Sequence, residues 1–192
     1  IAIAALLALA ATDAAAACRD AAGPRVNWRK CDKSDADLAG AALSGADLRE
    51  AMFIRTRFMG ADLSKANLYG ATLFYADLSG ARAEDAKAAH LTLSDATLIG
   101  AHFARADMTG ASFLRANAAG VNLDGASLRN AHFDEAILVK ASFVGADLAN
   151  SIFLGARLQG ANLSRADLTA ADLTGADLRA AQMWKTQAKG KL

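Results

Sequence analysis

The stretch Ala36-Asp37-Leu38-Ala39-Gly40 introduces a five-residue pattern that recurs thirty times between residues 36 and 185 without a change of phase. The middle residue of a unit is Leu in eighteen units and Phe in seven, and the other five units have Ala or Met there. Ala stands two residues before the middle in twenty-six of the thirty units. A fixed short period is typical of a repeat architecture and limits the possible folds before any other signal.

A period of five excludes one long regular element. On an α-helix, five residues turn by about 500°, so successive middle residues would be spread around the whole helix and leave no buried face. On a flat strand, an odd period sends successive middle residues to opposite faces. The chain must therefore turn at every unit, so that each Leu or Phe points to a common axis. This arrangement is a solenoid, in which each coil packs only against its neighbours.

The other positions of the unit agree with a turning chain. Gly occupies thirteen of the thirty last positions, where a turn needs a permissive backbone. Asp or Asn occupies thirteen of the thirty places just before the middle residue, where we expect the side chain to point outward beside a turn. The Ala position is expected to face inward near a corner that admits only a small side chain.

The units Ala61-Asp62-Leu63-Ser64-Lys65 and Ala171-Asp172-Leu173-Thr174-Gly175 resemble the pentapeptide-repeat family, in an exported bacterial type. The resemblance covers about four fifths of the chain. It implies an all-β fold, a right-handed quadrilateral β-helix with four units per coil and therefore about seven to eight coils. The residues alone leave the number open, because the Phe residues form columns with either three or four units per coil.

Four segments are expected along this single domain of 192 residues: a signal peptide at 1–17, an N-terminal cap at 18–35, the β-helix at 36–185 and a basic tail at 186–192. Residues 1–17 hold an apolar run too short to span a bilayer, followed by small residues that suit a cleavage site. We therefore expect a periplasmic or extracellular protein. The alternatives are an Ala-rich helix packed on the coils and a lipoprotein anchored at Cys18.

The cap contains both cysteines, Cys18 and Cys31, which we expect to form a disulfide in an oxidising compartment. Counting back by fives puts Cys31 and Val26 in the small inward position and Trp28 in the axial position. Two degenerate units would then begin the coil, and Trp28 would close its open end. A redox couple or half of a metal site is less favoured, because there is no C-x-x-C motif and the three His residues lie far away in the sequence.

Two further stretches leave alternatives open. Residues 81–90 have only Ala83 and Ala88 on the axis and a good helix propensity, but we favour a continuous coil over a short looped-out helix. At the other end, Met183 and Trp184 are expected to cover the final coil. The tail after them is short for a full cap, so pairing of two copies through this end is one possible form of self-association.

The sequence offers no recognisable catalytic chemistry. His90, His102 and His132 do not suggest a joint metal site, and the many Asp residues are interpreted as solvated turn formers. There is no Gly-rich phosphate loop, no Ser/His/Asp arrangement and no basic stripe with interleaved aromatic residues. We therefore predict no enzyme activity, no cofactor, no metal and no nucleic-acid partner.

One surface feature is uneven. With four units per coil, two adjacent faces carry ten large apolar residues in outward positions, and the other two faces carry only Tyr69, Val144 and Trp184. The ten residues are Met52, Ile54, Met59, Phe74, Ile99, Leu114, Ile137, Val139, Ile152 and Leu154. A contiguous apolar patch usually marks an interaction surface, whereas scattered exposed apolar residues are ordinary. We predict that this side binds an unknown protein partner or a second copy of the chain.

The sequence thus predicts a non-enzymatic, exported structural or protein-interaction module that presents a β-helical rod. The alternative comes from the resemblance, since some pentapeptide-repeat proteins resemble duplex DNA and protect type II topoisomerases. Three features disfavour it: the expected export, the lack of a long C-terminal extension, and the charge. The repeat units carry sixteen acidic and fourteen basic residues, net −2, whereas a DNA mimic needs a strong negative field.

Overall fold

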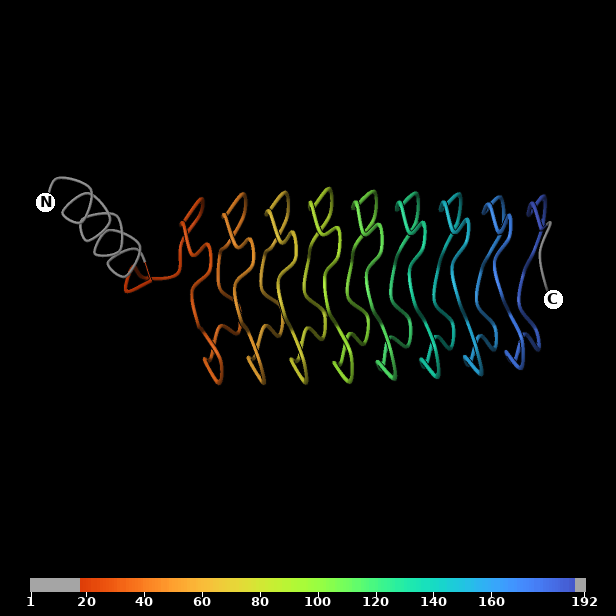
Figure 1. The fold of residues 1–192 in the computed structure, drawn as a ribbon, viewed down its shortest axis with the longest axis horizontal. Helices are drawn as coiled ribbons and strands as arrows, with labels where there is room; N and C mark the ends of the chain where they lie inside the picture. The colour runs from red at the N-terminus through yellow and green to blue at the C-terminus, as the bar shows by residue number, and fades with distance from the viewer. Residues whose placement is uncertain (1–17, 189–192) are drawn as a thin grey trace, which may run out of the picture.

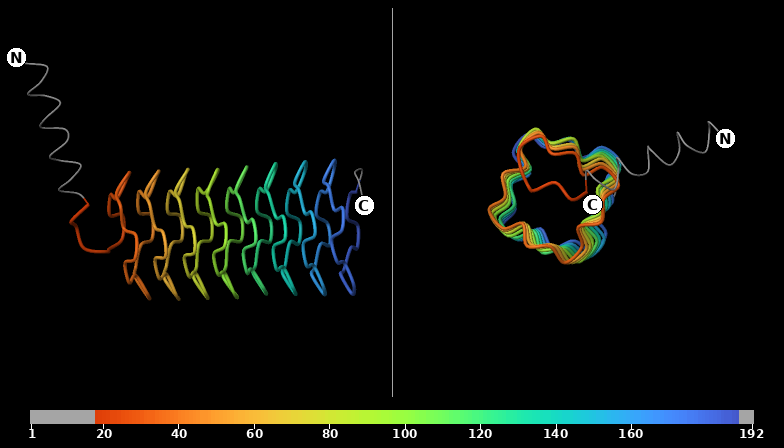
Figure 2. Two further views of the ribbon diagram at one scale, coloured as in Figure 1. Left: turned by 60° about the horizontal axis from the view of Figure 1, so that its bottom comes forward. Right: turned by 90° about the vertical axis from the view of Figure 1, so that its left-hand side faces the viewer.

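The computed structural model describes residues 18–188, which form one rod of stacked coils (Figure 1). Parallel bridges join residues that are twenty apart, from the pair Asn27–Asp47 to the pair Asp167–Gln187. Four five-residue units therefore make one coil, which decides between the three-unit and four-unit alternatives. Seen along the rod, successive coils lie over one another around a common axis (Figure 2).

The β-structure is reduced to single residues. Within residues 18–188 there is no helix and no strand longer than one bridged residue. Each unit has one bridged residue at its second position, and a turn occupies its fourth and fifth positions. A unit of five residues that must also turn a corner has room for only one paired position. Residues 18–188 also contain no helix with the length and apolar character needed to cross a membrane.

Hydrogen bonds between coils use most of the backbone of each unit. The second-position N–H donates to the preceding coil, as from Asp62 to the Ala41 carbonyl (2.9 Å), and the third donates to the following coil, as from Leu63 to the Arg82 carbonyl (2.6 Å). Where the second residue is Asp or Asn, the fourth-position N–H can donate to its side chain, as from Ser64 to Asp62 Oδ1 (3.0 Å). This bond explains the frequent Asp and Asn at the second position. Their side chains accept a hydrogen bond from the fourth-position N–H, which has no partner in the hydrogen bonds between coils.

The fifth position adopts a left-handed backbone in every unit from Arg25 to Lys185, with φ between 54° and 72°. The thirteen Gly residues of this row were expected there, but twenty residues with side chains share the conformation. Such residues avoid positive φ when unconstrained. Here their N–H groups also donate to the next coil, as from Lys65 to the Glu84 carbonyl (2.9 Å), so inter-coil pairing holds the strained backbone in place.

The core follows the axis of the rod along its whole length. The rings of Phe113, Phe133 and Phe153, twenty residues apart, stack with centroids 4.7 and 4.6 Å apart. Phe143, on another face, packs its ring edge against Phe133 at 5.8 Å. All four side chains are fully buried. The coil continues through residues 81–90, since Arg82 and Lys87 are each bridged on both sides, and the favoured continuous coil is confirmed.

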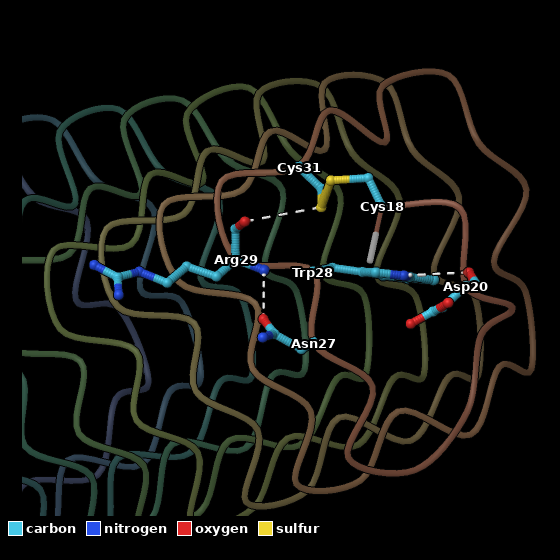
Figure 3. Close-up of a disulfide and its surroundings, with 6 residues drawn as sticks. All are labelled: Cys18, Asp20, Asn27, Trp28, Arg29 and Cys31. Carbon is cyan, nitrogen blue, oxygen red and sulfur yellow. Dashed lines mark hydrogen bonds between the residues drawn. A yellow bond between two sulfur atoms is a disulfide. The ribbon is translucent and has the colours of Figure 1, made fainter. Parts of the chain in front are cut away.

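Trp28 closes the N-terminal end of the rod (Figure 3). Its side chain is 1% exposed, and its indole N–H donates to the Asp20 carbonyl at 3.3 Å. The Lys33 ammonium lies 3.9 Å from the centre of the Trp28 ring. Cys31 is equally buried and forms a disulfide with Cys18, their Cα atoms 5.4 Å apart. The sulfur of Cys18 is thus occupied, which is incompatible with a lipid attached to the same atom.

The expected signal peptide at 1–17 and the last four residues of the basic tail, 189–192, lie outside the described residues.

Candidate functional site

The twenty-residue register divides the rod into four faces, each one unit wide. Face 1 contains the units that begin at residues 51, 71, 91, 111, 131 and 151, with those beginning at 31 and 171 toward the ends. Face 2 contains the units that directly follow them. The ten large apolar residues predicted as an interaction surface all lie on these two faces. We call these ten residues, Met52, Ile54, Met59, Phe74, Ile99, Leu114, Ile137, Val139, Ile152 and Leu154, the apolar side.

All ten residues of the apolar side are at least partly solvent-exposed, and none is counted in the core. The most exposed of them keep between 36% and 47% of their surface accessible. These are Met52, Met59, Phe74, Ile99 and Leu154. The other five are intermediate, because neighbouring coils cover part of each side chain. The structure thus places these residues outward on two adjacent faces.

One residue of this region was missed by sequence reasoning. Tyr75 is 62% exposed and lies at the fifth position of face 1, directly after Phe74. Fifth positions were interpreted only as turn residues, so their side chains were not considered. We call the fifth positions of face 1 the corner row, since they lie where face 1 meets face 2. From N- to C-terminus, the corner row is Asp35, Arg55, Tyr75, Asp95, Arg115, Glu135, Gly155 and Gly175.

Ion pairs between coils order the charges of the corner row. Arg55 Nε donates to Asp35 Oδ1 at 2.6 Å, and Arg115 Nε donates to Asp95 Oδ1 at 2.8 Å. The second guanidinium nitrogen completes each pair in a bidentate geometry. Hydrogen bonding from Arg115 lowers the pKa of Asp95 below its usual value. Opposite charges twenty residues apart are the sequence signal that could have identified these pairs.

The opposite side of the rod carries mixed charges. Arg105 and Asp85 form a bidentate pair like those of the corner row, with Nε–Oδ1 at 2.8 Å. Arg49 Nε donates to Asp47 Oδ1 at 2.7 Å and lowers the pKa of Asp47. Two shallow open grooves lie here. One is lined by Ser44, Asp62, Ser64, Lys65, Arg82, Glu84, Asp85 and Arg105, and the other by Arg49, Asn67, Tyr69, Lys87, Ala89 and Asp107.

The titratable groups of residues 18–188 do not converge on one reacting point. The His132 ring nitrogen Nδ1 lies 3.6 Å from Asp134, and the His90 ring contacts Tyr69 edge-on at 5.7 Å. Within this range no three His, Cys, Asp or Glu residues are grouped so that they could hold a metal ion. The carboxyl groups of Asp35 and Asp95 have their pKa lowered by hydrogen bonds from Arg side chains. A carboxyl group with a lowered pKa is ionised near neutral pH, so it accepts hydrogen bonds and does not serve as a proton donor.

Comparison with known proteins identifies relatives of this rod. The family profile "Pentapeptide repeats" matches in eight copies between residues 31 and 184. The matched segments are 31–68, 55–87, 76–113, 89–125, 111–153, 126–165 and 151–184. Comparison with curated proteins gave no match.

Three solved structures illustrate the similarity. HetL, a pentapeptide repeat protein involved in heterocyst differentiation regulation from the cyanobacterium Nostoc, is 30% identical over 85% of this chain and 87% of HetL, with a TM-score of 0.42. A pentapeptide repeat protein from the Arabidopsis thaliana thylakoid lumen is 30% identical over 52% of this chain and 69% of its own, with a TM-score of 0.50. A trypsin-treated form of QnrB1, a plasmid-mediated fluoroquinolone resistance protein, is 19% identical over 90% of this chain and 86% of its own, with a TM-score of 0.59.

The relatives imply the right-handed quadrilateral β-helix that the sequence resemblance predicted. Given the in-phase five-residue units, the twenty-residue register and the profile match across residues 31–184, this chain belongs to the pentapeptide-repeat family.

Proposed function

We propose that this protein is a non-enzymatic, exported structural or protein-interaction module that makes contact through the apolar side of its rod. Thirty units at four per coil make about seven and a half coils on one hydrogen-bonded backbone. The observation that carries the proposal is the uneven distribution of large apolar side chains around that backbone. Ten lie on faces 1 and 2, whereas the other two faces carry Tyr69, Val144 and Trp184 in the equivalent positions.

Exposed apolar side chains in rows favour protein contact over small-molecule binding. Neighbouring members of a row, such as Ile54 and Phe74, lie one coil apart and present adjacent apolar side chains, although Ser94 and Asp134 interrupt the same row. Monomeric soluble proteins rarely expose large contiguous apolar patches, and such patches commonly bind other proteins. The inter-coil hydrogen bonds hold the backbone of these rows, so little conformational entropy would be lost when they bind.

Two features support export. Residues 1–17 have the apolar run and small-residue end of a secretory signal peptide. The disulfide between Cys18 and Cys31 suits an oxidising compartment. The thylakoid-lumen relative indicates that a protein of this family can reside in a lumenal compartment.

Topoisomerase protection is the weaker candidate. QnrB1 is a fluoroquinolone resistance protein, but a similarity at 19% identity concerns the fold alone. A DNA-like surface needs a continuous negative field, and here arginines neutralise carboxylates along the rod, as in the pairs Arg55–Asp35 and Arg105–Asp85. Cell fractionation tests this choice together with the export. A cytoplasmic product with an uncut N-terminus would contradict export and favour topoisomerase protection.

Two matched triple variants test the interaction surface. The first changes Ile54, Leu114 and Leu154 on face 1 to Asp. The second changes Ala104, Val144 and Ser164, which occupy the same unit position on the opposite face, to Asp. We expect immobilised wild-type protein and the second variant to retain the same envelope proteins or further copies of this chain, and the first variant to lose them. Equal retention by both variants, or no retention by the wild type, would contradict the proposal.

A further inference from the structure

We infer that the partner on the apolar side is a second copy of this chain, bound antiparallel along face 1 and its corner row. This inference rests on the proposed interaction function and identifies its partner. The two-fold axis would lie midway between the levels of Asp95 and Arg115. The dimer contact would therefore run along the side of the rod and leave both ends free.

The geometry of such a contact follows from symmetry. A two-fold axis in the interface, perpendicular to both rods, reverses the rod direction and places each row of side chains against the same row of the other copy. Because coils are spaced by twenty residues, Asp95 then faces Arg115 of the second copy and Tyr75 faces Glu135. One flat contact uses one face. Four units share one coil, so face 2 is turned away from face 1 by about a quarter of a revolution around the rod.

The charges of the corner row are self-complementary about this axis. Asp95 of each copy meets Arg115 of the other, so two inter-copy pairs join the two bidentate pairs already present within the copies. Tyr75, which is 62% exposed, comes opposite the Glu135 carboxylate. Arg115 already lies within electrostatic reach of both Glu135 and Tyr75 in one copy. Four alternating charges at the centre of an interface favour one orientation and one register.

Four of the six apolar residues of face 1 show the same symmetry. Ile54 of one copy faces Leu154 of the other, and Met52 faces Ile152. Each apolar cluster lies two and a half coils from the axis, on either side of the central charges. The units that begin at residues 51 and 151 carry these apolar residues, and they lie symmetrically about the units that carry Asp95 and Arg115. The outer apolar residues and the central charges therefore share one centre.

Neighbouring registers place like charges at the axis. A shift of one coil in one direction places Asp95 against Asp95, although it also places Arg55 against Glu135. A shift in the other direction places Arg115 against Arg115 and Asp95 against Glu135, so like charges oppose binding most strongly there. In the favoured register Asp32 faces Asp172 at the two extremities, where solvent screens the repulsion. Phe74 faces Asp134 within the contact, which limits affinity and provides a variant that should improve it.

The contact is small. A face five residues wide measures at most about 16 Å, because its fourth and fifth residues form a turn. Contact along roughly 30 Å of the rod therefore buries no more than about 1,000 Å² in total over both copies. Interfaces at this lower limit are usually weak and reversible. We therefore expect association that depends on concentration and is measurable by sedimentation equilibrium at high protein concentration.

The test uses Asp95→Arg and Arg115→Asp, each alone and then mixed. Each single variant places like charges opposite each other twice, so we expect self-association to weaken at least tenfold. An equimolar mixture should restore association, because the two central guanidinium groups of the first variant then face the two central carboxylates of the second. Asp85→Arg and Arg105→Asp are the matched controls, since they break a similar bidentate pair on the opposite side and should leave association unchanged.

Asp134→Leu provides an opposite prediction, because it puts an apolar side chain against Phe74 and should tighten the dimer at least threefold. Thermal unfolding of every variant checks that the rod remains folded. A wild type that stays monomeric at millimolar concentration, or a mixture that does not associate, would overturn the inference. The two proposals can also be separated. If the wild type is monomeric and captures an envelope protein, and of the two triple variants only the face 1 variant loses it, self-association is wrong and the proposed interaction function stands.

Discussion

The inner and outer rows of face 1 differ sharply although they alternate along the same chain. Inward, Phe113, Phe133 and Phe153 are fully buried and stacked. The very next residues, Leu114, Asp134 and Leu154, point outward and share neither size nor charge. The inner row must fit the coil above and below, whereas the outer row meets solvent or a partner. The difference teaches that the repeat constrains the fold, while any specific function has to reside in the outward and corner positions.

The largest expected effect comes from an inner position. Phe133→Ala removes a ring stacked on both sides and should lower the free energy of unfolding by about 3–5 kcal/mol. Asp134→Ala, one residue later and outward, should change it by no more than about 0.5 kcal/mol. Urea unfolding measures both values. Similar losses for the two variants would contradict the division into inner and outer rows.

The N-terminal cap extends the inner row to the end of the rod. Reduction of the Cys18–Cys31 disulfide should lower the free energy of unfolding by roughly 3 kcal/mol. The bridge closes a loop and so reduces the conformational entropy of the unfolded chain, and reduction restores that entropy. The double variant Cys18→Ser, Cys31→Ser should show a similar loss and no response to reductant. Urea midpoints with and without dithiothreitol measure this effect. An unchanged wild-type midpoint on reduction would show that Trp28 and its contacts hold the cap without the bridge.

The fifth positions lie at the corners between the buried and the exposed rows. Their left-handed backbone makes them sensitive to an added side chain. Gly100 has a φ of 64° and free space around an added Cβ, so Gly100→Ala should cost about 1 kcal/mol through the backbone alone. At Gly110 an added Cβ would also meet His90 Nδ1 at 2.9 Å, so Gly110→Ala should cost more. His90→Ala should rescue only the second variant. Equal losses for both glycine variants, with no rescue, would contradict this distinction.

The smallest expected effect concerns the outer charges. Because Arg115 lowers the pKa of Asp95 in the folded state, the pair contributes stability above the unfolded Asp pKa of about 3.9. That contribution is lost as the pH falls through the lower, folded pKa. Arg115→Gln should therefore raise the pKa of the Asp95 carboxyl, measured by NMR titration. An unchanged Asp95 pKa would mean that the ion pair does not persist in solution.

The inner rows could be predicted from the sequence almost completely. Phase alone assigned Trp28 and Cys31 to inward positions, because a coil with a fixed period leaves no freedom at those places. The length of one coil, twenty residues, could not be derived from the Phe residues, since columns of Phe also form with three units per coil. The bridges between residues twenty apart establish this length. Residues 81–90 show the same principle, because inter-coil pairing overrides their local helix propensity.

The outer rows were predicted only in part. Large apolar residues at the second and fourth positions were located, because their outward direction follows from the phase. Tyr75, Asp95 and Arg115 were missed, since a turn position was judged by its backbone and not by its side chain. Left-handed residues other than Gly were also unforeseen, as in the case of Lys65. Local preference argues against that conformation, and the hydrogen bonds that impose it connect residues nineteen positions apart.

Small-angle X-ray scattering over a concentration series tests the central claim most directly, because it distinguishes contact through the side of the rod from contact through an end. An antiparallel side-by-side pair keeps about the maximum dimension of one rod while its cross-section grows. We expect this result for the wild type at high concentration and single rods for the face 1 triple variant. A maximum dimension that doubles at constant cross-section would show pairing through the ends and contradict the account.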